Sequence, residues 1–131
     1  MSVHPTSPAQ VLLVEDDDDA REMFADALRM TGYKVRTAAD GLAELRMLEA
    51  FEADVVVVDL ALPIANGFDV LNELRSVKRT HHLPVIAISG NERRLQEAKA
   101  KNPGFFAILA KPFDPQRLVR IVDRARRHVL N

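Results

Sequence analysis

The sequence predicts an α/β protein built on a doubly wound, five-stranded parallel sheet with the strand order 2-1-3-4-5. Short, continuous apolar runs alternate along the chain with amphipathic stretches, as strands and helices do in a parallel sheet covered on both faces. Five such units follow one another, and right-handed crossovers should connect them. The second expected strand alternates apolar and polar residues, and an edge position for it favours this strand order.

Length and composition indicate one globular domain. The chain has 131 residues, of which 47% are apolar and 28% charged, and this balance excludes a disordered chain. No apolar run approaches the ~18 residues of a membrane span. The absence of cysteine excludes disulfides, thiolate zinc sites and cysteine nucleophiles. Residues 1–9 show no periodicity and predict a disordered leader before a domain of residues 10–131. They do not form a secretory signal, so the expected location is cytoplasmic.

The strands are expected where apolar residues are continuous or strictly alternate. Runs of four or five apolar residues are typical of strands buried on both faces. The segment KVRTA alternates instead, which is typical of an edge strand. In chain order, the expected strands are Val11–Val14, Lys34–Ala38, Val55–Val58, Val85–Ile88 and Phe105–Leu109.

Amphipathic stretches between the strands predict the helices. The first helix begins after a run of Asp that can cap it and ends before Gly32. The last helix has Asp114 as its N-cap and Pro115 in its first turn. In chain order, the expected helices are Ala20–Met30, Leu42–Phe51, Phe68–Val77, Glu92–Lys101 and a final helix that starts at Pro115.

The positions of apolar residues predict the buried side of each helix. The second helix should bury Leu42, Ala43, Leu45, Met47 and Leu48, and the last should bury Leu118, Ile121, Val122, Ala125 and Val129. The fourth helix is only weakly amphipathic, with Leu95 and Ala98 as its main apolar anchors. We therefore expect the fourth helix to be loosely held.

Acidic residues follow the first and third expected strands. Ligands of doubly wound sheets bind beyond the carboxyl ends of the strands, at the switch point between strands 1 and 3 in this order. Glu15, Asp16 and Asp59 should converge there, and crowded carboxylates are unfavourable unless a cation neutralises them. Oxygen ligands without Cys or His favour a hard ion, and Mg²⁺ fits best.

An acidic run such as Asp16–Asp19 is also typical of a solvated helix start. Asp59 argues for a site because it ends a run of four Val, where an unpaired charge is costly. A loop with Pro63 and Gly67, and no helix cap pattern, is expected to follow it. Lys111 ends the fifth strand and can point into the same cleft. A structural salt bridge from Lys111 to an acidic residue is the alternative, and both roles can coexist.

Four ordered motifs carry a resemblance to a known family. They are LLVEDD, VVVVDLALPIANG, PVIAISG and LAKPF. Through them, residues 10–130 resemble the receiver domain of two-component response regulators, of the single-domain chemotaxis type. The resemblance implies a flavodoxin-like (β/α)5 fold, and this family is itself an example of the strand order given above.

The resemblance also implies a metal site. Asp16 looks like the direct Mg²⁺ ligand of the acidic pair, and Glu15 resembles the residue that acts mainly through metal-bound water. Asp59 and the backbone carbonyl of Ala61 are similar to the other protein ligands of the family. The implied cofactor is therefore Mg²⁺.

The same resemblance implies a phosphorylation chemistry. Asp59 looks like the phosphoacceptor, which takes a phosphoryl group from the phosphohistidine of a sensor histidine kinase or phosphotransfer protein. Ser89 matches the hydroxyl that hydrogen-bonds the phosphoryl group, and Lys111 matches the cation that pairs with it. Ile108 departs from the family, which usually has an aromatic or His switch residue there.

The implied output is protein contact, and an external substrate is not expected. The resemblance points to a downstream effector that binds through the fourth helix, fifth strand and fifth helix, with no direct nucleic acid, no membrane contact and a monomer or weak dimer. The alternatives are a receiver that is part of a longer response regulator or hybrid kinase, and an aspartate-nucleophile phosphohydrolase. The hydrolase reading is disfavoured because Ala61 stands where such enzymes, as a family, have a second Asp.

Charge is unevenly distributed along the chain. Residues 1–74 hold 15 acidic and 5 basic side chains, whereas residues 75–131 hold 4 acidic and 13 basic ones. Five arginines fall in the last helix, at positions 117, 120, 124, 126 and 127. Such a row is usually a solvated face, and the alternative is a surface that docks a partner.

Overall fold

The computed structural model describes residues 9–48, 51–62, 66–101 and 104–130. All but one residue of the expected leader 1–9 lies outside these ranges. Five parallel strands form one sheet in the order β2-β1-β3-β4-β5, which confirms the predicted topology. Their bounds are β1 Gln10–Val14, β2 Lys34–Ala38, β3 Val55–Asp59, β4 Val85–Ser89 and β5 Ala107–Ala110.

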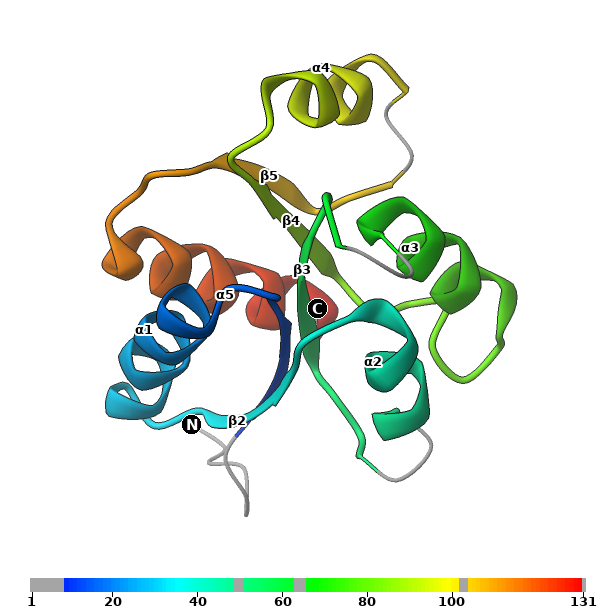
Figure 1. The fold of residues 1–131 in the computed structure, drawn as a ribbon. Helices are drawn as coiled ribbons and strands as arrows, with labels where there is room; N and C mark the ends of the chain where they lie inside the picture. The colour runs from blue at the N-terminus through cyan, green and yellow to red at the C-terminus, as the bar shows by residue number, and fades with distance from the viewer. Residues whose placement is uncertain (1–8, 49–50, 63–65, 102–103, 131) are drawn as a thin grey trace.

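A helix follows each strand, as the alternating pattern predicts. Helices α1 and α5 cover one face of the sheet, and α2, α3 and α4 cover the other (Figure 1). Their bounds are α1 Asp18–Met30, α2 Gly41–Met47, α3 Gly67–Ser76, α4 Glu92–Lys101 and α5 Pro115–Leu130.

Side-chain caps explain where several helices begin. The Asp17 carboxylate accepts a hydrogen bond from the backbone N–H of Ala20 at 2.8 Å, so the acidic run does cap α1. Asn66 caps α3 and forms a reciprocal capping box with Asp69. The prediction of a loop without a cap pattern after Asp59 is therefore wrong, because Asn66 and Asp69 form an N-x-x-D capping box at the start of α3.

The buried face of α2 differs from the predicted one. The helix ends at Met47 instead of Phe51, and Leu42 is 42% exposed. Glu44 instead lies at the centre of the buried side and is 0% exposed. Apolar residues occur around most of this short helix, so their spacing could not distinguish its two sides.

Strand β5 is an edge strand and is less buried than predicted. Leu109 is its only fully buried residue, and Ala110 is exposed. The strand begins at Ala107, while Phe105 and Phe106 precede it and pack at its start. A continuous apolar run cannot reveal that a strand has a neighbour on one side only.

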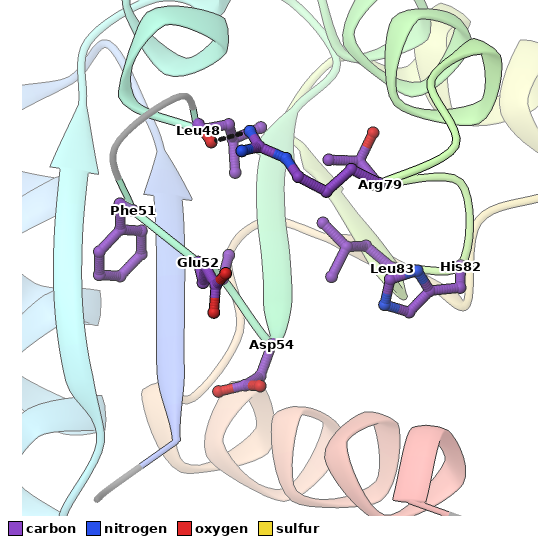
Figure 2. Close-up of a pocket in the computed structure, with 9 residues that line it drawn as sticks. Leu48, Phe51, Glu52, Asp54, Arg79, His82 and Leu83 are labelled. Atoms are coloured by element: carbon purple, nitrogen blue, oxygen red, sulfur yellow. Dashed lines mark hydrogen bonds between the residues drawn. The ribbon is translucent and has the colours of Figure 1, made fainter.

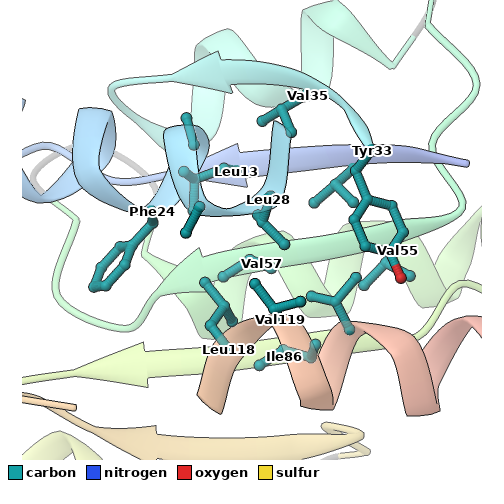
Figure 3. Close-up of a cluster of buried hydrophobic side chains, with 14 of the residues drawn as sticks. Leu13, Phe24, Leu28, Tyr33, Val35, Val55, Val57, Ile86, Leu118 and Val119 are labelled. Carbon is teal, nitrogen blue, oxygen red and sulfur yellow. The ribbon is translucent and has the colours of Figure 1, made fainter. Parts of the chain in front are cut away.

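The central strands hold the core together. Side chains alternate along β1 and β3, so Leu13, Val55 and Val57 face α1 and α5 while their neighbours face α2 and α3. Figure 3 shows Leu13 and Val57 meeting Leu28 of α1 and Leu118 of α5 between sheet and helices. This packing fixes the carboxyl ends of β1 and β3 side by side, where the predicted site lies.

Candidate functional site

Three predicted carboxylates converge at the carboxyl edge of the sheet. Glu15 directly follows β1 and Asp59 ends β3, and these residues are 0% and 5% exposed. Asp16 is exposed beside them. One carboxylate oxygen of each residue lies within 4.8 Å of those of the other two. The expected convergence of the acidic residues is therefore present.

Lys111 contributes the positive charge of the site. Its ammonium group donates a hydrogen bond to Oδ2 of Asp59 at 2.8 Å and another to Oε1 of Glu15. Burial alone would lower the pKa of Lys111, but the contacts with Asp59 and Glu15 outweigh it and raise this pKa. Burial raises the pKa of Glu15 despite its hydrogen bonds from Lys111 and Asp17. Lys111 thus makes the predicted salt bridge and lies among the converging carboxylates.

Backbone groups hold the carboxylates in place. The N–H of Ala61 donates to Oδ1 of Asp59 at 2.8 Å, and the N–H of Asp17 donates to Oε2 of Glu15 at 3.1 Å. The Arg21 guanidinium donates to the backbone carbonyl of Glu15 at 2.9 Å. Asp17 and Arg21 were not among the predicted site residues, and their role depends on loop geometry that the sequence pattern does not encode.

Ser89 ends β4, next to the strand that carries Asp59. Its hydroxyl is buried and accepts a hydrogen bond from the N–H of Asn91 at 3.0 Å. Its carbonyl accepts from the backbone N–H of Lys111 at 2.8 Å. Ile88, one residue earlier, is the register partner of Asp59. Ser89 therefore lies at the carboxyl edge of the sheet, on the side of Asp59 that is away from Glu15.

Gly67 is a further residue of the site region whose role the sequence did not reveal. A Cβ atom at this position would lie 3.0 Å from the Asp59 carbonyl oxygen and 3.0 Å from Cδ2 of Leu60. The start of α3 therefore approaches β3 too closely for a side chain. Only a glycine lets α3 begin directly against the strand that ends in Asp59.

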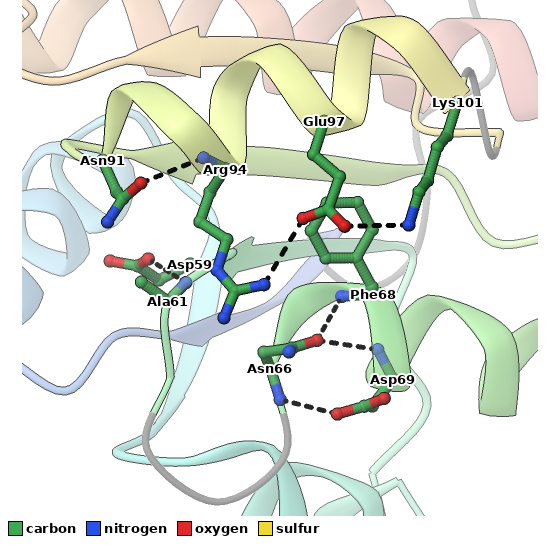
Figure 4. A network of polar contacts seen from close by, with 9 residues as sticks. All are labelled: Asp59, Ala61, Asn66, Phe68, Asp69, Asn91, Arg94, Glu97 and Lys101. Carbon is green, nitrogen blue, oxygen red and sulfur yellow. Dashed lines mark hydrogen bonds and ion pairs between the residues drawn. The ribbon is translucent and has the colours of Figure 1, made fainter.

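Helix α4 packs against Leu60 and Phe68, next to the start of α3. Glu97 pairs with Arg94 at 3.4 Å and with Lys101 at 2.8 Å, and Figure 4 shows these three side chains between α4 and the start of α3. Lys101 Nζ lies 5.8 Å from the centre of the Phe68 ring. Leu95 and Ala98 are the buried residues of α4, as predicted. Ile108 is half-buried and packs in their cluster.

Two surface pockets lie away from this site. One has a volume of about 250 Å³. Figure 2 shows it between Phe51, Asp54 and His82, close to where β3 and β4 begin. The neighbouring pocket, between α2 and α3, shares Leu48 and Arg79 with it. Neither contains a residue of the carboxylate site, which is at the opposite edge of the sheet.

The residues at the carboxyl edge fit a hard divalent cation. Lys111 pairs with two of the three clustered carboxylates, so a bound cation would offset the negative charge that Lys111 leaves unbalanced. The donors are oxygen atoms, which Mg²⁺ prefers. In the described ranges no helix is long and apolar enough to cross a membrane.

The response regulator receiver domain family matches residues 11–123. The chain belongs to this family. Chemotaxis protein CheY-3 of Vibrio cholerae is 32% identical over 116 residues, which cover 88% of this chain and 89% of that protein. The transcriptional regulator NtrC of Bradyrhizobium sp. is 34% identical over 119 residues, which cover 90% of this chain and 24% of NtrC.

A solved receiver domain has the same fold. The receiver domain of the sensor histidine kinase PA1611 from Pseudomonas aeruginosa, described with a magnesium ion in its active site cleft, has a TM-score of 0.81 and 31% identity to this chain. The match covers 92% of this chain and 98% of that receiver. Receiver domains are signalling modules that interact with histidine kinases and effectors. The receiver described here spans 24% to 54% of the length of four curated relatives that it matches.

Proposed function

We propose that Asp59 accepts a phosphoryl group from the phosphohistidine of a sensor histidine kinase or phosphotransfer protein. The observation that carries this proposal is the position of the Asp59 carboxylate. It ends a buried central strand, Lys111 Nζ lies 2.8 Å from its Oδ2, and two further carboxylates are next to it. A structural ion pair would need only one of these three acidic groups.

The transfer is a displacement at phosphorus. An oxygen atom of the Asp59 carboxylate forms a P–O bond while the P–N bond to the donor imidazole breaks. The electron pair of the broken bond stays on the imidazole nitrogen, and solvent supplies any proton that this nitrogen takes up. Lys111 offsets negative charge on a phosphoryl oxygen, and the hydroxyl of Ser89 donates a hydrogen bond to another.

Glu15, Asp16, Asp59 and the backbone carbonyl of Ala61 would hold Mg²⁺. When bound, the ion neutralises charge on the phosphoryl oxygens during transfer. Of the acidic pair that follows β1, Asp16 would be the direct ligand and Glu15 would act through water, because Asp16 is exposed whereas Glu15 is buried and accepts from Lys111 and from the Asp17 N–H. Asp16→Ala should therefore weaken Mg²⁺ binding, measured calorimetrically, more than Glu15→Ala does. Equal affinities in the two variants would contradict this ranking.

Intact mass after incubation with acetyl phosphate and Mg²⁺ tests the phosphoacceptor. We expect one added phosphoryl group in the wild type, none in Asp59→Asn, and one in the matched control Asp26→Asn, because Asp26 is exposed on α1. An adduct that persists in Asp59→Asn would refute the assignment. Beryllofluoride with Mg²⁺, a mimic of the phosphoryl group, should likewise bind the wild type and the Asp26 control only.

We further propose that the phosphorylated state is transmitted through the Ser89 loop and α4. Ile108 replaces the usual aromatic switch residue and packs with Leu95 and Ala98, so it should keep its rotamer in both states. Amide NMR shifts with and without beryllofluoride should change most in residues 89–101. A dominant change at Ile108 and its strand would show that the signal passes through β5 instead.

The partners we propose are a kinase or phosphotransfer protein and an effector that contacts α4, β5 and α5. The proposed domain extends over residues 10–131, and its proposed location is the cytoplasm. The acyl phosphate is read by protein contact, without an external substrate. Binding of a candidate effector should increase after phosphorylation and remain basal in Asp59→Asn.

A further inference from the structure

Helices α1 and α5 lie side by side on one face of the sheet (Figure 1). Their outer surfaces carry opposite charges, acidic on α1 and basic on α5. On α5 the exposed row is Arg117, Arg120, Arg124 and Arg127. At ~100° per residue these four positions fall within roughly 80° of the helix circumference, opposite the buried Leu118 and Val122. The row is therefore a narrow positive stripe along the outer side of α5.

The arginines of this stripe have no ion-pair partner among the described residues. The carboxylate of α5 itself, Asp123, is engaged by the Tyr33 hydroxyl instead. Arginines three and four residues apart repel one another and weaken an isolated helix. The stripe thus costs stability in the single chain, and a partner with carboxylates at matching positions would remove this cost.

The outer side of α1 carries carboxylates at the same spacing. Asp19, Glu22 and Asp26 are exposed and fall within roughly 60° of the circumference. They are separated by three and four residues, and Arg117, Arg120 and Arg124 have the same spacing. Because each helix follows a strand of the same parallel sheet, both begin at its carboxyl edge and run the same way. The two rows therefore match in spacing and direction.

Apolar side chains lie between the two rows. Met23 is 47% and Met30 is 86% exposed, and both are on the outer side of α1. The Arg29 guanidinium donates to the carbonyl of Val35 in β2 at 3.0 Å, so the side of α1 that carries Arg29 faces β2 at the edge of the sheet. The methionines are on the opposite side of α1, which faces α5. Phe24 is on that side too and stacks on Phe113, which precedes α5. The face thus has an apolar strip with an acidic row on one side and a basic row on the other.

We propose that this α1–α5 face binds a second copy of the chain. A two-fold axis parallel to the helices, along the methionine strip, places the acidic row of each copy opposite the arginine row of the other. The same operation brings Met23 and Met30 against their symmetry equivalents, which gives an apolar centre with a charged rim. This inference does not depend on the proposed phosphorylation.

The bipolar character of the face is what favours a second copy over nucleic acid. A polyanion wide enough to cover the arginine row would also meet the acidic row of α1, and the like charges would repel it. A partner of this face must itself present acidic and basic rows in the complementary order. The face of the chain, rotated about the axis described above, meets that requirement.

Light scattering and sedimentation over a range of protein concentrations test the proposal. At low ionic strength we expect the mass to rise from 14.6 kDa toward twice that value, and high salt should reverse the rise. Glu22→Arg and Arg120→Glu should each weaken association at least about tenfold. An equimolar mixture of these two variants should recover a heterodimer, because every facing pair is then attractive. Glu73→Arg, at an exposed position of α3, is the matched control and should associate like the wild type.

Cysteine cross-linking gives an independent readout. The chain has no cysteine, so Met30→Cys adds the only thiol, and mild oxidation should yield a covalent dimer through that position. Val77→Cys, at a 43% exposed residue of another face, should cross-link much more slowly. The proposal is overturned if the wild type stays monomeric at every concentration. It is also overturned if Glu22→Arg and Arg120→Glu leave dimerisation unchanged, or if the mixture of these two variants does not form the heterodimer.

Discussion

The buried carboxyl group of Glu44 should make the stability of this receiver depend on pH. Its two carboxylate oxygens have no hydrogen-bond partner among the described residues, and its side chain is 0% exposed. Burial raises the pKa of Glu44 from 4.5 to about 8. The folded chain therefore keeps a proton at neutral pH that the unfolded chain releases, so stability is greatest below pH 4.5 and is lost as the pH rises through about 8.

The size of the effect follows from the two pKa values. Each tenfold difference in proton affinity corresponds to about 1.36 kcal/mol. For pKa values of 4.5 and about 8, the loss of unfolding free energy is about 3 kcal/mol at pH 7 and about 5 kcal/mol well above pH 8. This is a large part of the stability of a domain of this size.

Glu44→Gln isolates this contribution, because glutamine has nearly the same shape and helix propensity but does not titrate. Urea unfolding followed by circular dichroism suits a chain without tryptophan. The stability of Glu44→Gln relative to wild type should increase by about 3 kcal/mol between pH 4 and pH 7. Glu73→Gln, at an exposed position of α3, is the control and should show no such trend. A difference between Glu44→Gln and wild type that is constant with pH would refute the reasoning.

Three further predictions concern local contacts. Gly67→Ala should destabilise the fold by about 1–3 kcal/mol, because the added Cβ meets the Asp59 carbonyl oxygen at 3.0 Å. Thermal unfolding should show a lower Tm for this variant, and an unchanged Tm would contradict the close contact. Asn66→Ala should cost about 1 kcal/mol through loss of the α3 cap, with Asn66→Asp close to wild type in the same urea titration. Burial and the hydrogen bond to Asp123 raise the pKa of Tyr33 to about 12, so this single tyrosine should ionise well above pH 10 in an absorbance titration, and Asp123→Asn should lower the midpoint. An ordinary midpoint in the wild type would argue against the contact.

The sequence predicts the sheet and the site because both depend on local patterns. A run such as Val55–Val58 must be buried on both faces, and a carboxylate such as Asp59 directly after it must lie at the edge of the sheet. Glu44 could not be predicted, because a glutamate in a helix is normally assigned to solvent, and only the packing of α2 against the sheet and α3 decides otherwise. Gly67 escaped prediction for a similar reason, since its close approach to β3 involves two elements.

The charged rows of α1 and α5 also could be predicted only in part from the sequence. The spacing of the arginines in α5 is visible in the sequence, but their relation to the carboxylates of α1 depends on the two helices being neighbours. Helix neighbours are fixed by the strand order, which the sequence does predict. Their rotation about their own axes comes from packing, and only the structure reveals that Met23 and Met30 lie between the rows.

The contacts of Lys111 limit how many acceptors it can serve. A lysine ammonium has three hydrogen atoms to donate, and Glu15 and Asp59 each take one. One N–H donor of the ammonium group is left for a phosphoryl oxygen. A phosphoryl oxygen that needs more than this single hydrogen bond must compete with Glu15, which is 0% exposed and would keep only its hydrogen bond from the Asp17 N–H. The binding of an anion to the Lys111 ammonium group is thereby linked to the protonation of Glu15, which follows β1, whereas Asp59 ends β3.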